Sequence, residues 1–139
     1  MNLFQVNILS TDRPFYTGHC ESLIIPTQQG KYGIMAHHSN MIFAVYPGAL
    51  LYRLPGKNTE AISVSHGMVK VENNDVLVLV DSLERVEDID VNRAKRAADK
   101  AMEEMLQKKG IQEYHSAQAH LARATSRLRV KGKYDNIHY

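Results

Sequence analysis

The first part of the chain carries the two-residue period of β-strands. Apolar and polar residues alternate strictly over Ala61–Ser65 and Val69–Glu72, which predicts strands with one buried face and one wet face. Val76–Val80 is apolar at every position, which predicts a strand that is covered on both faces. Turn pairs such as Pro47-Gly48 and Asn73-Asn74 separate these runs at short intervals. The expected strands are Leu3–Leu9, Glu21–Pro26, Tyr32–Met35, Met41–Tyr46, Ala49–Leu54, Glu60–Ser65, Met68–Glu72 and Val76–Ser82.

After Asp90 the period changes to that of an α-helix. Asp90 is a suitable N-cap, and Gly110 is a helix stop that follows the basic pair Lys108-Lys109. The stripe between them consists of Ala94, Ala97, Ala98, Ala101, Met102, Met105 and Leu106. A second stripe, which ends before Gly132, consists of Tyr114, Ala117, Leu121, Ala124 and Leu128. Two helices joined across Gly110 are expected to form an antiparallel hairpin.

These patterns define the expected fold class. Many short strands without intervening helices indicate a sandwich or a flattened barrel. The chain is therefore predicted to be α+β, with an antiparallel β-sandwich over residues 1–84, a junction over 85–89, a helical hairpin over 90–131 and a tail over 132–139. Both helix seams consist largely of alanine, and a buried carbon contributes only about 0.8 kcal/mol. We therefore expect the hairpin to be held loosely.

The net charge of +2 is distributed unevenly along the chain. Residues 1–89 contain six basic and nine acidic side chains, whereas residues 90–139 contain eleven basic and six acidic ones. The segment 121–133 holds five basic residues and no acidic one. This asymmetry predicts that the two parts of the chain face different surroundings.

Composition and spacing argue against several classes of function. Cys20 has no second cysteine to pair with, which fits a reducing compartment. The first residues do not read as a secretory signal, and no apolar run approaches the ~20 residues that span a bilayer. The pairs His37-His38 and His115/His120 have spacings unsuited to sharing a metal ion on a strand or helix. No Gly-x-x-x-x-Gly-Lys-Ser/Thr loop is present, so ATP is expected only as a ligand and not as a substrate. We predict no catalytic residue and no metal site; the enzymatic alternative is a small enzyme that uses Cys20 and a histidine.

Four segments together resemble one known family. Ile89–Ala94 is similar to the Ile/Leu-Asp-x-x-Arg-Ala motif at the strand-to-helix junction of the F-type ATP synthase epsilon subunit. Tyr32–Met35 followed by His38 is similar to the family's Phe-Gly-Ile-Leu-x-x-His stretch. Pro47–Leu50 resembles its Pro-Gly turn, and Ala122–Val130 resembles its second helix. The order and spacing of these matches cover about the full chain.

Two turns depart from the family's pattern. His66-Gly67 stands where members often have two glycines, and Ala36-His37 stands where they often have Pro-Gly. A histidine adopts a positive φ less readily than a glycine. The local backbone at these turns is therefore left open by the sequence.

The resemblance implies a non-catalytic subunit of the central stalk, or rotor, of a bacterial ATP synthase. Its implied partners are the gamma subunit, the c-ring and the alpha/beta catalytic head, and its implied role is to couple hydrogen ion or other ion transport to ATP synthesis. It would be a peripheral protein on the cytoplasmic face of the plasma membrane, in contact with the membrane only through the complex. Docking on gamma and the c-ring calls for an exposed apolar patch, for which Tyr32–Met41 and the Pro47-Gly48 turn are candidates.

The resemblance also implies a regulatory ATP site in the folded hairpin. Its residues are Glu84, Ile89, Asp90, Arg93, Ala94, Arg123 and Arg127. Arg123 and Arg127 are four residues apart and share one helical face, and an antiparallel hairpin brings that face near Arg93. Three guanidinium groups at one place would suit a triphosphate. The alternative is that Asp90 is only an N-cap and that the arginines form a solvated face.

The basic segment has a second implied role. In the family this helix can leave the hairpin, contact acidic regions of the catalytic subunits and block rotation during ATP hydrolysis. The corresponding docking residues are Arg123, Arg127, Arg129 and Lys131. A solubilising helix face is the simplest alternative. A nucleic-acid-binding module that uses the basic second helix is another, although the acidic β half and the lack of aromatic residues among the arginines count against it.

Overall fold

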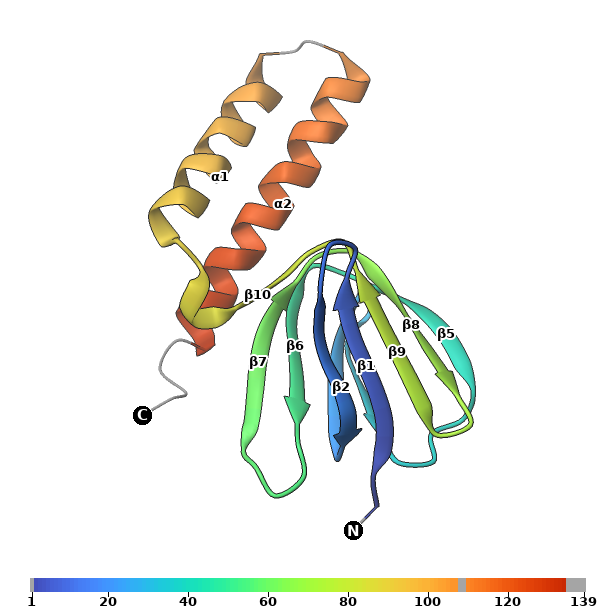
Figure 1. Ribbon diagram of the computed structural model, residues 1–139. Helices are drawn as coiled ribbons and strands as arrows, with labels where there is room; N and C mark the ends of the chain where they lie inside the picture. The colour runs from blue at the N-terminus through green and yellow to red at the C-terminus, as the bar shows by residue number, and fades with distance from the viewer. Residues whose placement is uncertain (1, 108–109, 135–139) are drawn as a thin grey trace. The chain divides into compact units, whose positions relative to one another are not determined.

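The computed structural model describes residues 2–107 and 110–134 and divides the chain into two compact units (Figure 1). The first unit ends at Arg85 and the second begins at Val86. The first contains the strands, and the second contains a short 3-10 turn and two helices. This composition confirms the predicted α+β fold class.

The first unit is a sandwich of two five-stranded sheets. One sheet has the order β2-β1-β9-β8-β5, and the other has the order β10-β7-β6-β3-β4. The strands of the first sheet are β1 (Phe4–Ser10), β2 (Pro14–Cys20), β5 (Met41–Val45), β8 (Gly67–Glu72) and β9 (Asp75–Val80). The strands of the second sheet are β3 (Ser22–Thr27), β4 (Gly30–Met35), β6 (Gly48–Arg53), β7 (Thr59–Val64) and β10 (Leu83–Arg85).

The core of the sandwich follows from the alternation in the sequence. In β1 every second residue is buried, and β8 and β9 repeat that pattern. Facing side chains from both sheets close the interior, with Phe4, Ile8, Leu23, Ile25, Ile34, Leu50 and Ile62 among the largest. Leu77 and Leu79 of β9 remain half-exposed on the outer face. The prediction that Val76–Val80 is covered on both faces is therefore wrong for this unit.

Two strands were not expected from the sequence. β2 begins at Pro14, and only Cys20 among its residues is buried. Its polar and glycine-containing sequence lacks the apolar alternation that marks a strand, because β2 is an edge strand of its sheet. β10 has only three residues, Leu83–Arg85, and pairs with β7. Such a short segment has no detectable period.

The direction of one strand pair was also not predicted. β1 runs parallel to β9, whereas every other pairing in the described part of the chain is antiparallel. Hydrophobic alternation shows which face of a strand is buried but carries no information on its direction. The sandwich is therefore antiparallel except for this one central pair.

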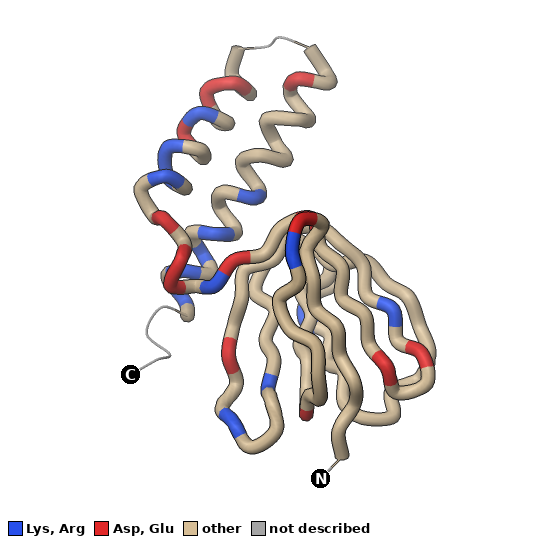
Figure 2. Tube along the Cα trace, in the orientation of Figure 1, with Lys and Arg blue, Asp and Glu red and all other residues tan. Residues whose placement is uncertain are grey.

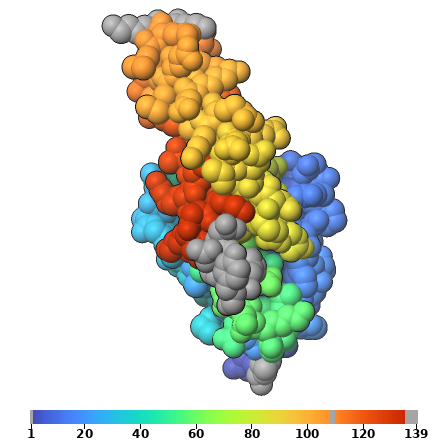
Figure 3. Space-filling model, turned by 90° about the vertical axis from the view of Figure 1, so that its left-hand side faces the viewer, coloured from blue at the N-terminus to red at the C-terminus, as the bar shows by residue number. Residues whose placement is uncertain are grey.

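The second unit consists of the 3-10 turn η1 (Val86–Asp88), helix α1 (Val91–Leu106) and helix α2 (Ile111–Tyr134). The two helices run antiparallel and lie side by side, as the predicted hairpin requires (Figures 1 and 3). Ala94 and Ala101 of α1 and Ala117 and Ala124 of α2 are buried along the seam. Gly132 lies inside α2, which continues to Tyr134, so the predicted stop at Gly132 is wrong. Lys108-Lys109 and most of the expected tail lie outside the described residues.

Candidate functional site

Asp90 forms the start of α1. Its backbone is extended, with φ −85° and ψ 104°, and its Oδ1 accepts a hydrogen bond from the Arg93 amide at 3.0 Å. The Asp90 carbonyl accepts the first helical bond from the Ala94 amide at 2.9 Å. This geometry is that of an N-cap, which is worth about 1 kcal/mol of helix stability. The predicted capping role of Asp90 is confirmed.

Ile89 and Ala94 flank this cap from the inside of the unit. Both are buried, and the Ile89 amide donates to the Val86 carbonyl at 3.2 Å. Ala94 is fully buried on the helix seam, so a larger side chain there would push the two helices apart. These two residues shape the place where α1 begins, and neither presents a polar side chain to a ligand.

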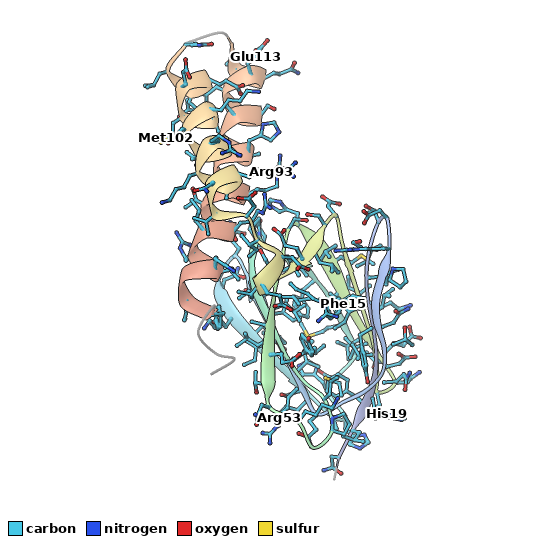
Figure 4. All side chains as sticks on the ribbon, turned by 60° about the vertical axis from the view of Figure 1, so that its left-hand side comes forward. Phe15, His19, Arg53, Arg93, Met102 and Glu113 are labelled. Carbon is cyan, nitrogen blue, oxygen red and sulfur yellow. The ribbon has the colours of Figure 1, made fainter. Side chains whose placement is uncertain are left out.

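The three arginines of the predicted ATP site lie on the two helices. Arg93 is exposed on the first turn of α1, and Figure 4 shows its side chain projecting from that helix. Arg123 and Arg127 are half-buried on α2. Because the helices are antiparallel, the half of α2 that carries them lies beside the first half of α1 (Figure 2). The hairpin therefore brings the three guanidinium-bearing segments to the same end.

Basic and acidic residues are distributed unevenly along the two helices. Glu103, Glu104 and Glu113 lie towards the end where α1 stops and α2 begins, and Figure 4 shows Glu113 at the start of α2. The basic residues lie mainly in the other half (Figure 2). The amide groups at the N-terminus of α1 add partial positive charge to that half. This end of the hairpin also holds the acidic residues Glu87, Asp88 and Asp90, so charges of both signs meet where α1 begins and α2 ends.

Glu84 is separated from the other predicted site residues by the division between the units. It lies in β10, opposite Ser63 of β7, and is half-buried. The other six predicted ATP-site residues belong to the second unit. The hairpin by itself therefore contains the whole predicted set except Glu84.

The predicted docking residues differ in their surroundings. Arg129 is exposed on α2, whereas Lys131 is half-buried. The Lys131 Nζ donates a hydrogen bond to the Val86 carbonyl at 3.1 Å, across 45 positions of sequence. Sequence reasoning missed this contact, because a lysine near the end of a basic helix gives no sign of a specific partner.

Cys20 lies in the core of the sandwich, where its surroundings do not favour a reactive thiol. Cys20 is fully buried, and burial raises the pKa of its thiol. A neutral thiol in the core is a poor nucleophile. The hydroxyl of Tyr32 lies 2.8 Å from His38 Nε2, while His38 Nδ1 lies 2.8 Å from the Ser39 carbonyl. In the described part of the chain, no group of three or more His, Cys, Asp or Glu side chains could hold a metal ion.

The outer face of the first sheet carries a row of apolar side chains, which we call the apolar row. Neighbouring strands pair its members in the order Ala44, Met68, Leu79, Leu9 and Pro14. Met68 is 40% exposed, and Ile42, beside the row on β5, is 67% exposed. The row crosses all five strands of the sheet. The row lies outside Tyr32–Met41 and the Pro47-Gly48 turn, the two docking segments that the sequence suggested. Its members come from strands that are distant in the sequence, so no single segment reveals it.

Among the described residues, no helix is long and apolar enough to cross a membrane.

The two units correspond to two known domain families. A family model described as "ATP synthase, Delta/Epsilon chain, beta-sandwich domain" matches residues 3–86. A second, described as "ATP synthase, Delta/Epsilon chain, long alpha-helix domain", matches residues 87–132. Both matches follow directly on one another and cover nearly the whole chain.

Relatives with known names agree with these matches. An ATP synthase epsilon chain of Ruminiclostridium cellulolyticum is 40% identical over 129 residues, which are 92% of this chain and 95% of that protein. An ATP synthase epsilon chain of Nitratidesulfovibrio vulgaris is 35% identical over 127 residues, 91% of this chain and 94% of that protein. The fold is similar to a chain in the mitochondrial ATP synthase structure of Euglena gracilis, with a TM-score of 0.79 at 17% identity over 91% of this chain and 79% of that one.

These comparisons do not support the nucleic-acid-binding alternative. The matched families and the named relatives all belong to ATP synthases. By its sandwich, its helical pair and its relatives of similar length, the chain belongs to the ATP synthase delta/epsilon family.

Proposed function

We propose that the protein is the epsilon-type subunit of the central stalk of a bacterial rotary ATP synthase and catalyses no reaction itself. The observation that carries this proposal is the end-to-end match of both units to the two domains of that family. The named bacterial relatives have nearly the same length as this chain, so the same division of labour between the units is expected. Its place is at the cytoplasmic face of the plasma membrane, where the complex holds it.

The sandwich is proposed to be the docking unit, which holds the protein on the gamma subunit and the c-ring. The apolar row supports this assignment because a contiguous apolar stripe on a wet sheet face is typical of a protein interface. Met68 and the adjacent Ile42 remain exposed when the chain is alone. We assign this face to the gamma subunit.

The helical unit is proposed to restrain ATP hydrolysis. The basic half of α2 has a charge suited to acidic surfaces on the catalytic subunits, and such complementarity mainly steers the encounter and sets its register. The seam between α1 and α2 is made of alanines, which bury little apolar area on each turn. A hairpin held in this way can exchange its internal contacts for contacts with a partner.

ATP is proposed to bind the closed hairpin as a regulatory ligand, with no cofactor required. Arg93, Arg123 and Arg127 would bind the phosphates, while Asp90, Ile89 and Ala94 shape the start of α1 beneath them. Glu84, which the resemblance also implied, belongs to the first unit and is left out of this proposal. A ligand at a hundred times its dissociation constant adds about 2.7 kcal/mol to the state that binds it. That gain is enough to reverse a tenfold bias towards the open hairpin.

The inhibitory role can be tested by assembling the complex with a chain truncated after Arg85. ATP hydrolysis should rise several-fold, because the unit that blocks rotation is missing. Co-purification of the truncated chain with gamma is the control, since it shows that the sandwich still docks. An unchanged hydrolysis rate in a fully assembled complex would contradict the inhibitory role.

The nucleotide site can be tested on the isolated full chain by thermal unfolding with and without ATP. Arg93→Ala should abolish the rise in melting temperature that ATP causes in the parent. Arg96→Ala is the matched control, because Arg96 is another exposed arginine on α1 outside the motif. Equal stabilisation of the parent and Arg93→Ala would remove Arg93 from the site.

A further inference from the structure

Lys131 joins the last turns of α2 to the segment that precedes α1. Its Nζ lies 3.1 Å from the carbonyl oxygen of Val86, the first residue of η1. The same oxygen accepts the Ile89 amide at 3.2 Å, so two donors converge on it. η1 also carries Glu87 and Asp88, so the ammonium group meets a turn of opposite charge. We call this contact the Lys131 clasp.

The clasp lies next to the proposed nucleotide site along both segments that it joins. Ile89 and Asp90 follow η1 directly, and Asp90 caps the helix that carries Arg93. On the other segment, Lys131 follows Arg127 by one helical turn, just as Arg127 follows Arg123. Residues four apart lie on one helical face, so these three form a single basic stripe. All three are half-buried.

Fixing one end of this stripe fixes the rotation of α2 about its own axis. A helix with an alanine seam has little side-chain interlocking to prevent it from turning or sliding. A directed hydrogen bond at Lys131 therefore adds a restraint on the helical face that also carries Arg123 and Arg127. The buried side chain of Val130 supports the same turn of the helix from the adjacent position.

We propose that Lys131 is a positioning residue of the nucleotide site, which orients Arg123 and Arg127 through its bond to the Val86 carbonyl and is withheld from docking while the hairpin is closed. This proposal rests on the regulatory ATP site of the proposed function. Lys131 is then not equivalent to the other three predicted docking residues, because its ammonium group is bonded within the closed hairpin. Opening of the hairpin breaks the clasp and releases the ammonium group together with the arginines.

The test compares Lys131→Met, Lys131→Arg and Lys133→Met in the isolated full chain. Lys131→Met keeps the length and apolar stem of the side chain but removes the donor. Lys131→Arg keeps a charged donor and should restore binding. Lys133→Met removes an equal charge from an exposed lysine of the same last turn, whose Nζ lies 5.4 Å from the Tyr134 ring centroid. ATP affinity is measured by calorimetry.

We expect Lys131→Met to raise the ATP dissociation constant by roughly three- to thirtyfold, as the loss of one charged hydrogen bond does. Lys131→Arg should stay within about threefold of the parent, and Lys133→Met should be unchanged. An equal loss in Lys131→Met and Lys133→Met would overturn the proposal, because it would reduce the effect to net charge. An unchanged dissociation constant in Lys131→Met would overturn it as well.

A second measurement separates the clasp from the ATP site itself. Amide hydrogen exchange without ATP should speed up in the segment 86–90 of Lys131→Met but not of Lys133→Met. If the parent binds no ATP, the nucleotide part of the proposed function fails, while faster exchange would still establish the clasp. If exchange is the same in both variants, the clasp itself is contradicted.

Discussion

Gly67 lies where two neighbouring strands of the sandwich approach too closely for a side chain. A Cβ at this position would lie 2.2 Å from the Leu79 carbonyl oxygen and 2.6 Å from the Val80 Cα. Both are backbone atoms of β9, so they cannot move aside without disturbing the pairing of β8 with β9. Gly33 in β4 provides the contrast, because nothing lies within 4 Å of its Cβ position.

The first prediction concerns these two glycines. Gly67→Ala should lower the free energy of unfolding by about 2 kcal/mol or more, because overpacking against backbone shifts the strand pair. Gly33→Ala should change it by no more than about 0.5 kcal/mol. Urea unfolding of both variants, followed by circular dichroism, measures the difference. Equal stability of the two variants would contradict the steric argument.

The structure shows the backbone of the turn at His37, which the sequence left open. It has φ 64°, in the left-handed region that disfavours residues with a Cβ. Its amide donates to the Asn74 Oδ1 at 2.6 Å, and the Asn74 Nδ2 donates to the Leu3 carbonyl at 3.0 Å. The turn is therefore held by hydrogen bonds from distant segments. This tertiary support lets a histidine stand where the family often has glycine.

At the scale of elements, the apolar row on the outer face of the first sheet exists only because the strands pair. β5, β8, β9, β1 and β2 each contribute one residue to the apolar row. No single strand contributes more than one residue to this row. Pairing alone aligns the five side chains into one stripe, and Ile42 extends it at the edge strand.

The second prediction tests this face. Met68→Glu or Ile42→Glu should weaken co-purification with gamma at least about tenfold, because a carboxylate would be buried in an apolar contact. Met35→Glu is the matched control: Met35 is 66% exposed but lies on β4, an edge strand of the other sheet. If the control weakens binding as much as the row variants do, the docking face is wrongly assigned.

The helices of the second unit owe their form to simple local signals. Asp90 caps α1, and small residues at helical spacing make the seam. Met102 and Leu106, which the sequence placed in the helical stripe, are instead 52% and 79% exposed. Figure 4 shows Met102 projecting from α1. On α1 the buried residues are Ala94 and Ala101, so the buried face of this helix is narrower than its apolar period predicted.

At the scale of the whole molecule, the hydrophobic core belongs entirely to the first unit. Every residue of that core lies between Phe4 and Leu83. The last strand of the first unit, β10, also makes contacts within that unit. The Arg85 guanidinium lies 5.0 Å from the centroid of the Phe15 ring, and the Arg13 guanidinium donates a hydrogen bond to the Leu83 carbonyl at 3.2 Å. The second unit buries far fewer large side chains, namely Val86, Ile89, Val130 and Tyr134 beside its alanines.

The third prediction follows from this imbalance. A fragment that ends at Arg85 should unfold cooperatively in urea. Its free energy of unfolding should lie within about 1 kcal/mol of the value for the sandwich in the full chain. A fragment comprising residues 86–139 should be only partly helical alone, because short helices gain most of their stability from packing. A disordered first fragment would show that the sandwich depends on the helices.

The sequence by itself determined the periodic features of this protein. Alternation within Val69–Glu72 defined the buried face of β8, and the change of period after Asp90 defined the hairpin. Each of these signals is local, since a burial pattern repeats within one element. Cap and turn residues such as Asp90 and Asn73-Asn74 act over a few positions in the same way.

Only the tertiary structure decided which distant residues meet. It paired β1 with β9 in parallel, added the edge strands β2 and β10, and aligned the apolar row across five strands. It also brought Lys131 to the Val86 carbonyl, although each residue is unremarkable in its own segment. Such contacts depend on how whole elements are placed in space. The hydrophobic period of one element does not indicate which other elements it will contact.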